Sequence, residues 1–212
     1  MDILAELSAA LQAGEDTKVA ELTEGAIAAA LAPKRILDDG LIAGMAVVGA
    51  RFKAHEIFLP DVLMAAKAMY AGLDRLRPLL VRDGVPALGK VVLGTVQGDL
   101  HDIGKNLVGI MLRGAGFEVI DLGNDVAPER FVDTAEREGA SVIGLSALLT
   151  TTMPGMGRVV DLVRRRELAG RIRVIVGGAP VCSSYAAEIG ADAYGFDAAN
   201  AVDRVKDLIH AR

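Results

Sequence analysis

The second part of the chain alternates short apolar runs with stretches that have helical periodicity, and this alternation limits the possible folds most strongly. Each run is followed by a helix signal, such as Pro128 or Pro154. Strands that alternate with helices in this way predict a parallel doubly wound, Rossmann-like sheet with both faces buried. The predicted strands are residues 90–96, 117–123, 141–148, 173–178 and 191–196. Ligands of such sheets bind at the carboxyl ends of the strands, so we expect the chemistry in the loops that follow them.

The first part of the chain has helical periodicity instead. Amphipathic stripes separated by short loops predict an antiparallel four-helix bundle. The stripes begin near Leu4, Val19, Pro33 and Pro60. Gly40 and Gly44 lie one turn apart and indicate a close helix crossing. Gly84 and Pro86 interrupt both patterns. We therefore expect a helical bundle at residues 1–82, a linker at 83–89 and an α/β domain at 90–212.

Charge and composition exclude several partners. The chain has 23 Lys and Arg residues against 28 Asp and Glu residues, no basic run longer than residues 164–166, and 4% aromatic residues. These values argue against nucleic-acid binding. No uncharged apolar run is long enough for a membrane span, and the N-terminus lacks the pattern of a secretory signal. A single cysteine, Cys182, rules out an internal disulfide, so we expect a cytoplasmic protein without a membrane or nucleic-acid partner.

The loop VQGDLHDIGKN at residues 96–106 carries the most distinctive chemistry. Its glycine spacing fits neither a dinucleotide fingerprint nor a phosphate loop. Asp99 and His101 are two residues apart, so the carboxylate can orient one ring nitrogen while the other nitrogen faces outward, as in metal-binding histidines. From these residues alone, an ordinary turn in which His101 caps a helix is an equally good interpretation.

A complete zinc site is not expected around His101. His55 belongs to the bundle, His210 lies near the end of the chain, and Cys182 is expected inside a helix. A single protein ligand to a metal implies that a cofactor supplies the others. The neighbouring strand-end loops offer small, neutral residues, which leave room for a buried ligand. These are Ser146, Thr150, Thr151, Thr152, Gly177, Gly178 and Ala179.

The segments Asp99–Gly104, Ser146–Leu148 and Gly177–Gly178 resemble the signature of cobalamin-binding domains that hold the cofactor base-off and histidine-on. The resemblance implies that His101 is the lower axial ligand of cobalt and that Asp99 bonds its other nitrogen. Thr152 stands where the methionine synthase relative has a serine that extends this relay. The same resemblance implies a slot for the displaced nucleotide tail. Its cofactor contacts would be Gly98, Asp99, Leu100, His101, Asp102, Ile103, Gly104, Ser146, Leu148, Thr150, Thr152, Gly177 and Gly178.

The segment Phe52–Val62 resembles the cap of cobalamin-dependent methionine synthase, in which a Phe and a Leu seven residues apart cover the methyl-bearing face. Phe52 and Leu59 have this spacing, and Val62 lies one turn further on. The alternative, which periodicity alone favours, is that all three side chains belong to the bundle core. The resemblance implies instead that they contact the cofactor.

The motifs GDLHDIGKN, DLGNDV, GLSALLTTTM and VGGAPV extend the resemblance over nearly the whole chain, to corrinoid proteins of three-component methyltransferase systems. Such a protein is a carrier that is not catalytic alone. It accepts a methyl group on cobalt from a substrate:corrinoid methyltransferase and delivers it to a second enzyme, for transfer to tetrahydrofolate or a thiol coenzyme. A reductive activase would be a third partner. Alternatives are the cobalamin subunit of a radical mutase, which normally lacks the bundle, and a cobalamin-dependent sensor, which needs a DNA-binding segment.

Overall fold

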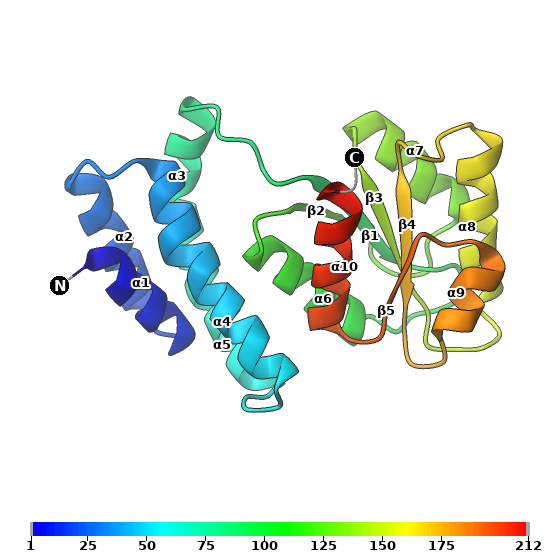
Figure 1. Ribbon diagram of the computed structural model, residues 1–212, viewed down its shortest axis with the longest axis horizontal. Coiled ribbons are helices and arrows are strands. Elements are labelled where there is room, and N and C mark those ends of the chain that lie inside the picture. Colours follow the sequence, from blue (N-terminus) through cyan, green and yellow to red (C-terminus); the bar gives the residue numbers. More distant parts are fainter. Residues whose placement is uncertain (1, 211–212) are drawn as a thin grey trace. The chain divides into compact units, whose positions relative to one another are not determined.

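The computed structural model describes residues 2–210, and the chain divides into two compact units (Figure 1). The helical unit comes first, and the α/β unit begins at Leu88. The last helix of the first unit ends at Arg82 and the first strand begins at Lys90. The change in sequence pattern near residue 84 therefore coincides with the change in secondary structure.

The helical unit consists of four helical stretches, counted within the described residues, as the apolar stripes predict. Its elements are α1 (Ile3–Gln12), α2 (Asp16–Ala28), α3 (Pro33–Arg35), the π-helix η1 (Ile36–Ile42), α4 (Ala43–Lys53) and α5 (Leu59–Arg82). The third stretch runs through α3, η1 and α4. Its core side chains Ile36 and Leu41 are five residues apart and both fully buried, which suits the wider turn of a π-helix.

Two glycines of the third stretch let α1 approach closely. A Cβ atom at Gly40 would lie 2.6 Å from Leu7 Cδ2, and one at Gly44 would lie 3.1 Å from the carbonyl oxygen of Ser8. Neither position has room for a side chain. The close helix crossing that the glycine spacing predicts is therefore confirmed.

The α/β unit contains a parallel sheet whose strand order, within the described residues, is β2-β1-β3-β4-β5. The strands are β1 (Lys90–Thr95), β2 (Glu118–Asp121), β3 (Val142–Ser146), β4 (Arg173–Gly177) and β5 (Ala193–Gly195). The helices are α6 (Ile103–Gly114), α7 (Pro128–Glu138), α8 (Pro154–Arg165), α9 (Ser183–Ile189) and α10 (Ala198–His210). The doubly wound, Rossmann-like sheet expected from the sequence is thus confirmed. The strand order reverses between β1 and β3, since β2 lies on one side of β1 and the later strands on the other. Ligands of such sheets bind at this switch point.

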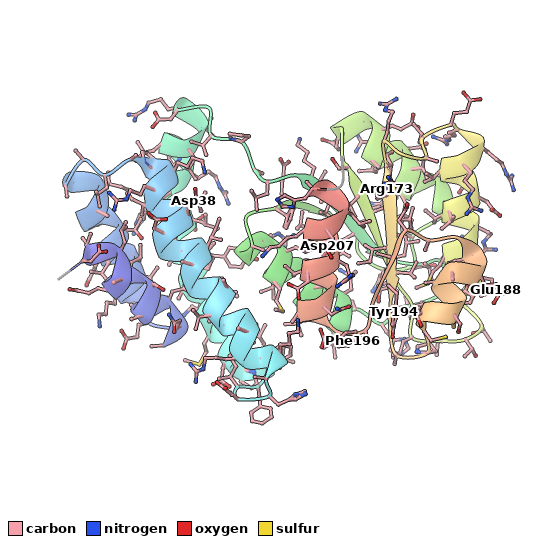
Figure 2. All side chains as sticks on the ribbon, in the orientation of Figure 1. Asp38, Arg173, Glu188, Tyr194, Phe196 and Asp207 are labelled. Atoms are coloured by element: carbon pink, nitrogen blue, oxygen red, sulfur yellow. The ribbon has the colours of Figure 1, made fainter. Side chains whose placement is uncertain are left out.

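One face of the sheet is closed by an apolar core. Phe131 of α7 and Met156 of α8 are fully buried against Ile143 of β3. Figure 2 shows the side chains of this unit, with Arg173 at the start of β4 and Phe196 just beyond β5. The expectation that Cys182 lies inside a helix is wrong: it is the exposed residue immediately before α9, in an extended conformation.

Among the described residues, no helix combines the length and the apolar character that crossing a membrane requires.

Candidate functional site

The loop between β1 and α6 leaves the sheet at its topological switch point and carries Asp99 and His101. Gly98 makes the sharp turn before them with a φ of +85°, a region that side chains rarely adopt. The carbonyl oxygen of His101 accepts a hydrogen bond from Thr95 Oγ1 at 2.9 Å, so the far end of the loop is tied back to β1.

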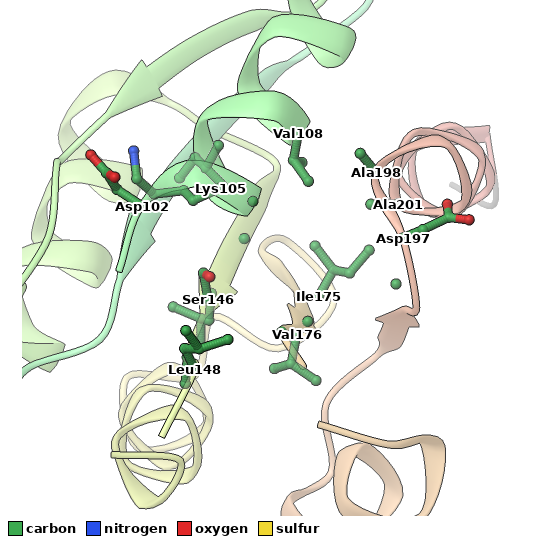
Figure 3. A pocket seen from close by; sticks show the side chains of 18 of the residues that line it. Asp102, Lys105, Val108, Ser146, Leu148, Ile175, Val176, Asp197, Ala198 and Ala201 are labelled. Atoms are coloured by element: carbon green, nitrogen blue, oxygen red, sulfur yellow. The ribbon is translucent and has the colours of Figure 1, made fainter. Parts of the chain in front are cut away.

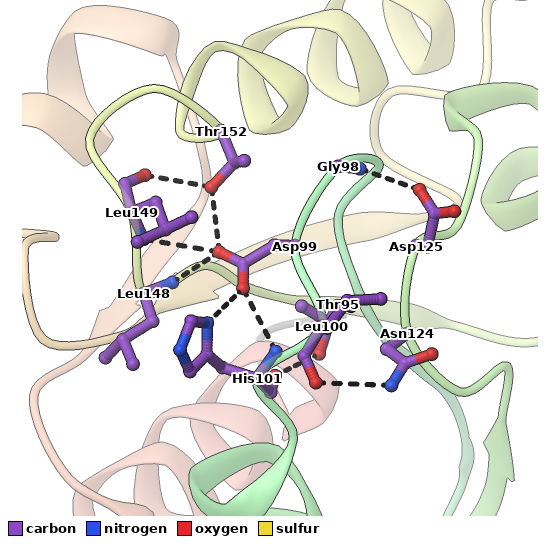
Figure 4. A network of polar contacts seen from close by, with 10 residues as sticks. All are labelled: Thr95, Gly98, Asp99, Leu100, His101, Asn124, Asp125, Leu148, Leu149 and Thr152. Atoms are coloured by element: carbon purple, nitrogen blue, oxygen red, sulfur yellow. Dashed lines mark hydrogen bonds and ion pairs between the residues drawn. The ribbon is translucent and has the colours of Figure 1, made fainter.

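Asp99 lies at the centre of a hydrogen-bond network (Figure 4). Its side chain is fully buried, and donors from two loops point at its two oxygens. Oδ1 accepts from the backbone N–H of His101 at 3.1 Å and from its ring Nδ1 at 2.7 Å. Oδ2 accepts from the N–H groups of Leu148 and Leu149, at 2.8 and 3.2 Å, and from Thr152 Oγ1 at 2.8 Å. The network joins the first strand-end loop to the third.

This network keeps Asp99 ionised. Burial favours the neutral acid and by itself raises the pKa of the carboxyl group. The hydrogen bonds from the Leu148 N–H, from the ring and N–H of His101 and from Thr152 outweigh burial and hold the pKa far below its usual range. Near neutral pH the carboxylate is therefore an acceptor only.

An ionised Asp99 fixes the state of the His101 ring. Since the carboxylate has no proton to give, Nδ1 must carry the hydrogen in the 2.7 Å contact. In the neutral ring the lone pair is then on Nε2. The His101 side chain is 51% exposed, whereas that of Asp99 is inaccessible. The site therefore presents one oriented imidazole lone pair outward from a rigid base, as in metal-binding histidines.

A cavity of about 600 Å³ opens beside His101, between α6, α10 and the carboxyl ends of β3, β4 and β5 (Figure 3). This volume lies within the usual range of small-molecule sites. Its lining is mainly apolar, and Ser146 and Asp102 are among its few polar side chains. The lining residues expected from the sequence are Leu100, His101, Asp102, Ile103, Gly104, Ser146, Leu148, Gly177, Gly178 and Ala179.

Small residues in register across the sheet make this cavity deep. Ser146 of β3 pairs with Gly177 of β4, which pairs with Gly195 of β5. Paired residues point to the same face of a sheet, so this row leaves that face open. Gly177, the last residue of β4, and Gly178 just after it also make room for the protein itself. A Cβ atom at Gly177 would lie 2.8 Å from the carbonyl oxygen of Gly195, and one at Gly178 would lie 1.9 Å from that of Ala147.

Gly178→Ala is expected to lower the free energy of unfolding by about 2–4 kcal/mol, because it combines steric overlap with a φ of +133°. Gly170→Ala is the matched control: its φ is +93°, but a Cβ atom there meets nothing within 4 Å. Urea unfolding of both variants separates the cost of the steric overlap from the cost of the positive φ. Equal losses in both variants would show that steric overlap with Ala147 contributes nothing.

Lys105 is a buried cation of the cavity wall, yet it has no free proton to offer a ligand. Its Nζ lies 2.7 Å from both carboxylate oxygens of Asp121 and 2.6 Å from Asn106 Oδ1. These three acceptors use the three hydrogens of the ammonium group. Lys105 therefore ties the first turn of α6 to the end of β2.

Several expected site residues lie outside the cavity lining. Gly98, Asp99 and Thr152 lie behind His101 in the loop and network, and Thr150 is exposed. The three expected cap residues belong to the helical unit. There, Phe52 and Leu59 are half-buried, whereas Val62 is fully buried, as a core residue would be.

The sequence prediction missed the contribution of the fifth strand. Phe196 and Asp197, just after β5, and Ala198 and Ala201 of α10 line the cavity. Phe196 is 62% exposed. A usable signal was present, since the strand ends in a glycine and the following helix begins with small residues at helical spacing. Further lining residues that the prediction did not include are Val91, Leu93, Lys105, Val108, Leu112, Gly144, Leu145, Ala147, Ile175, Val176, Gly195 and Val205.

An outward-facing histidine beside a deep cavity at the switch point of a parallel sheet defines a cofactor-binding α/β domain. Residues 89–205 match the family model described as B12 binding domain, and residues 3–77 match a second model with the same description. The chain belongs to the B12-binding family, and within it to the corrinoid proteins of methyltransferase systems.

Relatives over the full length support this membership. A corrinoid protein of Desulfitobacterium hafniense (strain Y51) is 42% identical over 99% of this chain and 98% of its own length. The dimethylamine corrinoid protein of Methanosarcina barkeri is 43% identical, with 98% of both chains covered.

The fold also matches solved structures of cobalamin-binding proteins. The methanol:cobalamin methyltransferase complex MtaBC from Methanosarcina barkeri aligns with a TM-score of 0.89 and 32% identity, over 100% of this chain and 81% of that one. A cobalamin-binding protein from Desulfitobacterium hafniense DCB-2 aligns with a TM-score of 0.80 and 33% identity, over 97% of this chain and 98% of that one.

Proposed function

We propose that this protein is a methyl carrier that holds a corrinoid base-off, with His101 as the lower axial ligand of cobalt. The observation that carries the proposal is the His101 ring, whose Nδ1 is bonded to the buried Asp99 while Nε2 remains available. His101 also lines the apolar cavity, so a ligand of cobalt and a pocket for the nucleotide tail occur together.

The residues present fit such a group. Leu100 and Ile103 are large apolar side chains, yet they are 70% and 74% exposed. Neighbouring apolar side chains left exposed in this way often mark a binding surface. Both line the cavity mouth with His101. We infer that they pack against the corrin ring, that Ser146 donates a hydrogen bond within the slot, and that Gly177 and Gly178 keep its wall flat.

Each residue of the network then has a role in holding the cofactor. A bound corrinoid supplies a cobalt centre that can accept and release a methyl group. Asp99 keeps the His101 ring oriented and its Nδ1 protonated, which raises the donor strength of Nε2. Thr152 Oγ1 lies 2.8 Å from Asp99 and 2.9 Å from the carbonyl oxygen of Leu149. Its single hydrogen can bond to either acceptor, so Thr152 can strengthen or weaken the stabilisation of the Asp99 carboxylate.

The carrier role implies two methyltransferase partners. One transfers a methyl group from its substrate to the carrier, and the other passes it to tetrahydrofolate or a thiol coenzyme. Relatives named for dimethylamine, and a matched complex named for methanol:cobalamin methyltransferase, support this assignment. A reductive activase would restore the carrier after accidental oxidation of cobalt.

A transfer assay tests the carrier role. The full chain, loaded with methylcobalamin, is offered to a corrinoid-dependent methyltransferase together with tetrahydrofolate or a thiol coenzyme. We expect one of the two acceptors to become methylated. A loaded protein that transfers to neither acceptor contradicts the proposal.

Phe52 and Leu59 are proposed to shield the upper face of the bound corrinoid. Because Phe52 is only half-buried, Phe52→Ala should change the melting temperature of the cofactor-free protein little. It should make the methylcobalamin-loaded protein more sensitive to light, since an unshielded methyl radical escapes before it recombines. Unchanged photolysis together with a large drop in melting temperature would assign Phe52 to the core.

Gly104 offers a test of where the corrinoid lies. It is exposed in the first turn of α6, and a Cβ atom there meets nothing within 4 Å. Gly104→Ala should therefore stabilise the cofactor-free protein by up to about 1 kcal/mol. It should weaken binding of cobalamin, because the added methyl group occupies space beside His101. Gly157→Ala in α8 is the control, and the assignment fails if both variants bind cobalamin equally well.

A further inference from the structure

The loop between β2 and α7 is hydrogen-bonded to the backbone of the loop that carries His101. These bonds do not involve the Asp99 side chain. Asp125 Oδ1 accepts from the N–H of Gly98 at 2.7 Å, and the N–H of Asp125 donates to the carbonyl oxygen of Asp99 at 3.0 Å. Asn124 Nδ2 donates to the carbonyl oxygen of Leu100 at 3.2 Å. Backbone groups of the three consecutive residues before His101 are thus bonded to the neighbouring loop; Figure 4 shows the bonds to Gly98 and Leu100.

Asp125 adopts an uncommon backbone conformation that allows these hydrogen bonds. Its φ is +52°, in the left-handed region, which Asp tolerates better than most residues. Strained backbone of this kind occurs where the surrounding structure imposes it, often at functional sites. Here the conformation lets one residue bond both the N–H of Gly98 and the carbonyl oxygen of Asp99.

We propose that Asp125, assisted by Asn124, is a positioning residue that presets the direction of the His101 ring. Asp125 is exposed and does not line the cavity, so it acts through the backbone of Gly98 and Asp99. A loop held in its ligand-bound shape binds a metal more tightly, because less conformational entropy is lost on binding. The inference rests on the proposed ligation of cobalt by His101.

Three substitutions separate the contributions of the Asp125 and Asn124 hydrogen bonds. Asp125→Gly keeps the left-handed backbone and removes the acceptor, Asp125→Asn keeps an acceptor oxygen at the same place, and Asn124→Ala removes the bond to Leu100. Asp192→Ala is the matched control. Asp192 grips the amino end of β4 in the same way, with Oδ2 accepting from the N–H of Val174 at 2.8 Å and its own N–H donating back at 2.8 Å.

The first measurement is amide hydrogen exchange of the full chain without cofactor. In Asp125→Gly the N–H of Gly98 should exchange faster, by about two- to ten-fold, the factor that one hydrogen bond contributes to an equilibrium. Asp125→Asn should restore protection. Exchange at Gly98 that is unchanged in Asp125→Gly overturns the inference.

The second measurement is binding of diaquacobinamide, a corrinoid that lacks a lower base of its own, followed by its visible spectrum. The dissociation constant should rise about two- to ten-fold in Asp125→Gly, less in Asn124→Ala, and stay unchanged in Asp125→Asn and Asp192→Ala. An equal rise in Asp192→Ala would overturn the inference, because it would show a general loss of stability. If His101→Ala binds diaquacobinamide with the wild-type spectrum, the proposed function itself fails.

Discussion

Asp99→Ala is expected to lower the free energy of unfolding by about 3–5 kcal/mol, the cost of breaking a buried, hydrogen-bonded charge network. The substitution leaves the N–H groups of Leu148 and Leu149 and the hydroxyl of Thr152 without their common acceptor. Urea unfolding of the full chain measures the loss. Asp125→Ala removes an exposed acceptor that binds the same loop from the neighbouring β2–α7 loop; it is the matched control and should cost far less.

Asp99→Asn tests orientation of the ring with a smaller effect on stability. The side of Asp99 that faces Thr152 receives three donors, so the amide oxygen must take that side. The amide NH₂ group then faces His101 Nδ1, which must give up its proton to become an acceptor. The proton moves to Nε2, and the lone pair available to a metal is lost. We expect cobalamin affinity or methyl-transfer rate to fall about 10- to 100-fold.

The low pKa of Asp99 also makes stability depend on pH, with a defined sign. A carboxyl group whose pKa is lower in the folded state stabilises the fold fully above its unfolded pKa, about 3.9. That contribution is lost as the pH falls from there towards the folded pKa. Wild type should therefore lose stability more steeply than Asp99→Asn between about pH 4 and pH 2. Parallel curves in this range would show that Asp99 is not held ionised by its network.

The elements around the site could be predicted well because their signals are local. Apolar runs bounded by glycine and proline marked every strand, and the Asp-x-His spacing placed the ring and carboxylate in one loop. The contact at 2.7 Å between Asp99 and His101 agrees with that prediction. A contact between side chains two residues apart in one loop can be predicted without knowledge of the rest of the fold.

Contacts between distant segments could not be predicted in this way. The N–H groups of Leu148 and Leu149 donate to Asp99 from about fifty residues away along the chain. No periodic pattern in the sequence predicts such a contact. The grip of Asp125 on Gly98 likewise depends on β1 and β2 being neighbours in the sheet. Gly177 and Gly178 were expected to make room for a ligand, but the structure shows that neighbouring carbonyl groups also require them.

His101→Ala is expected to leave the fold intact and to remove the cobalt ligand. The side chain is 51% exposed, so its loss creates no large cavity in the core. Affinity for cobalamin should fall by at least about 10-fold, because loss of the ligand itself should cost no less than loss of a residue that orients it. His210→Ala, at an exposed position near the end of the chain, is the control and should bind as wild type does. Equal affinity in the two variants would exclude His101 from the site.

Axial ligation itself is tested most directly by electron paramagnetic resonance of the cobalamin-loaded protein in its Co(II) state, with histidine labelled by ¹⁵N. We expect that the threefold splitting from an axial ¹⁴N becomes a twofold splitting from ¹⁵N, and that His101→Ala abolishes this twofold splitting. A threefold splitting that persists in the labelled protein would show that the cofactor keeps its own base, and would contradict ligation by His101.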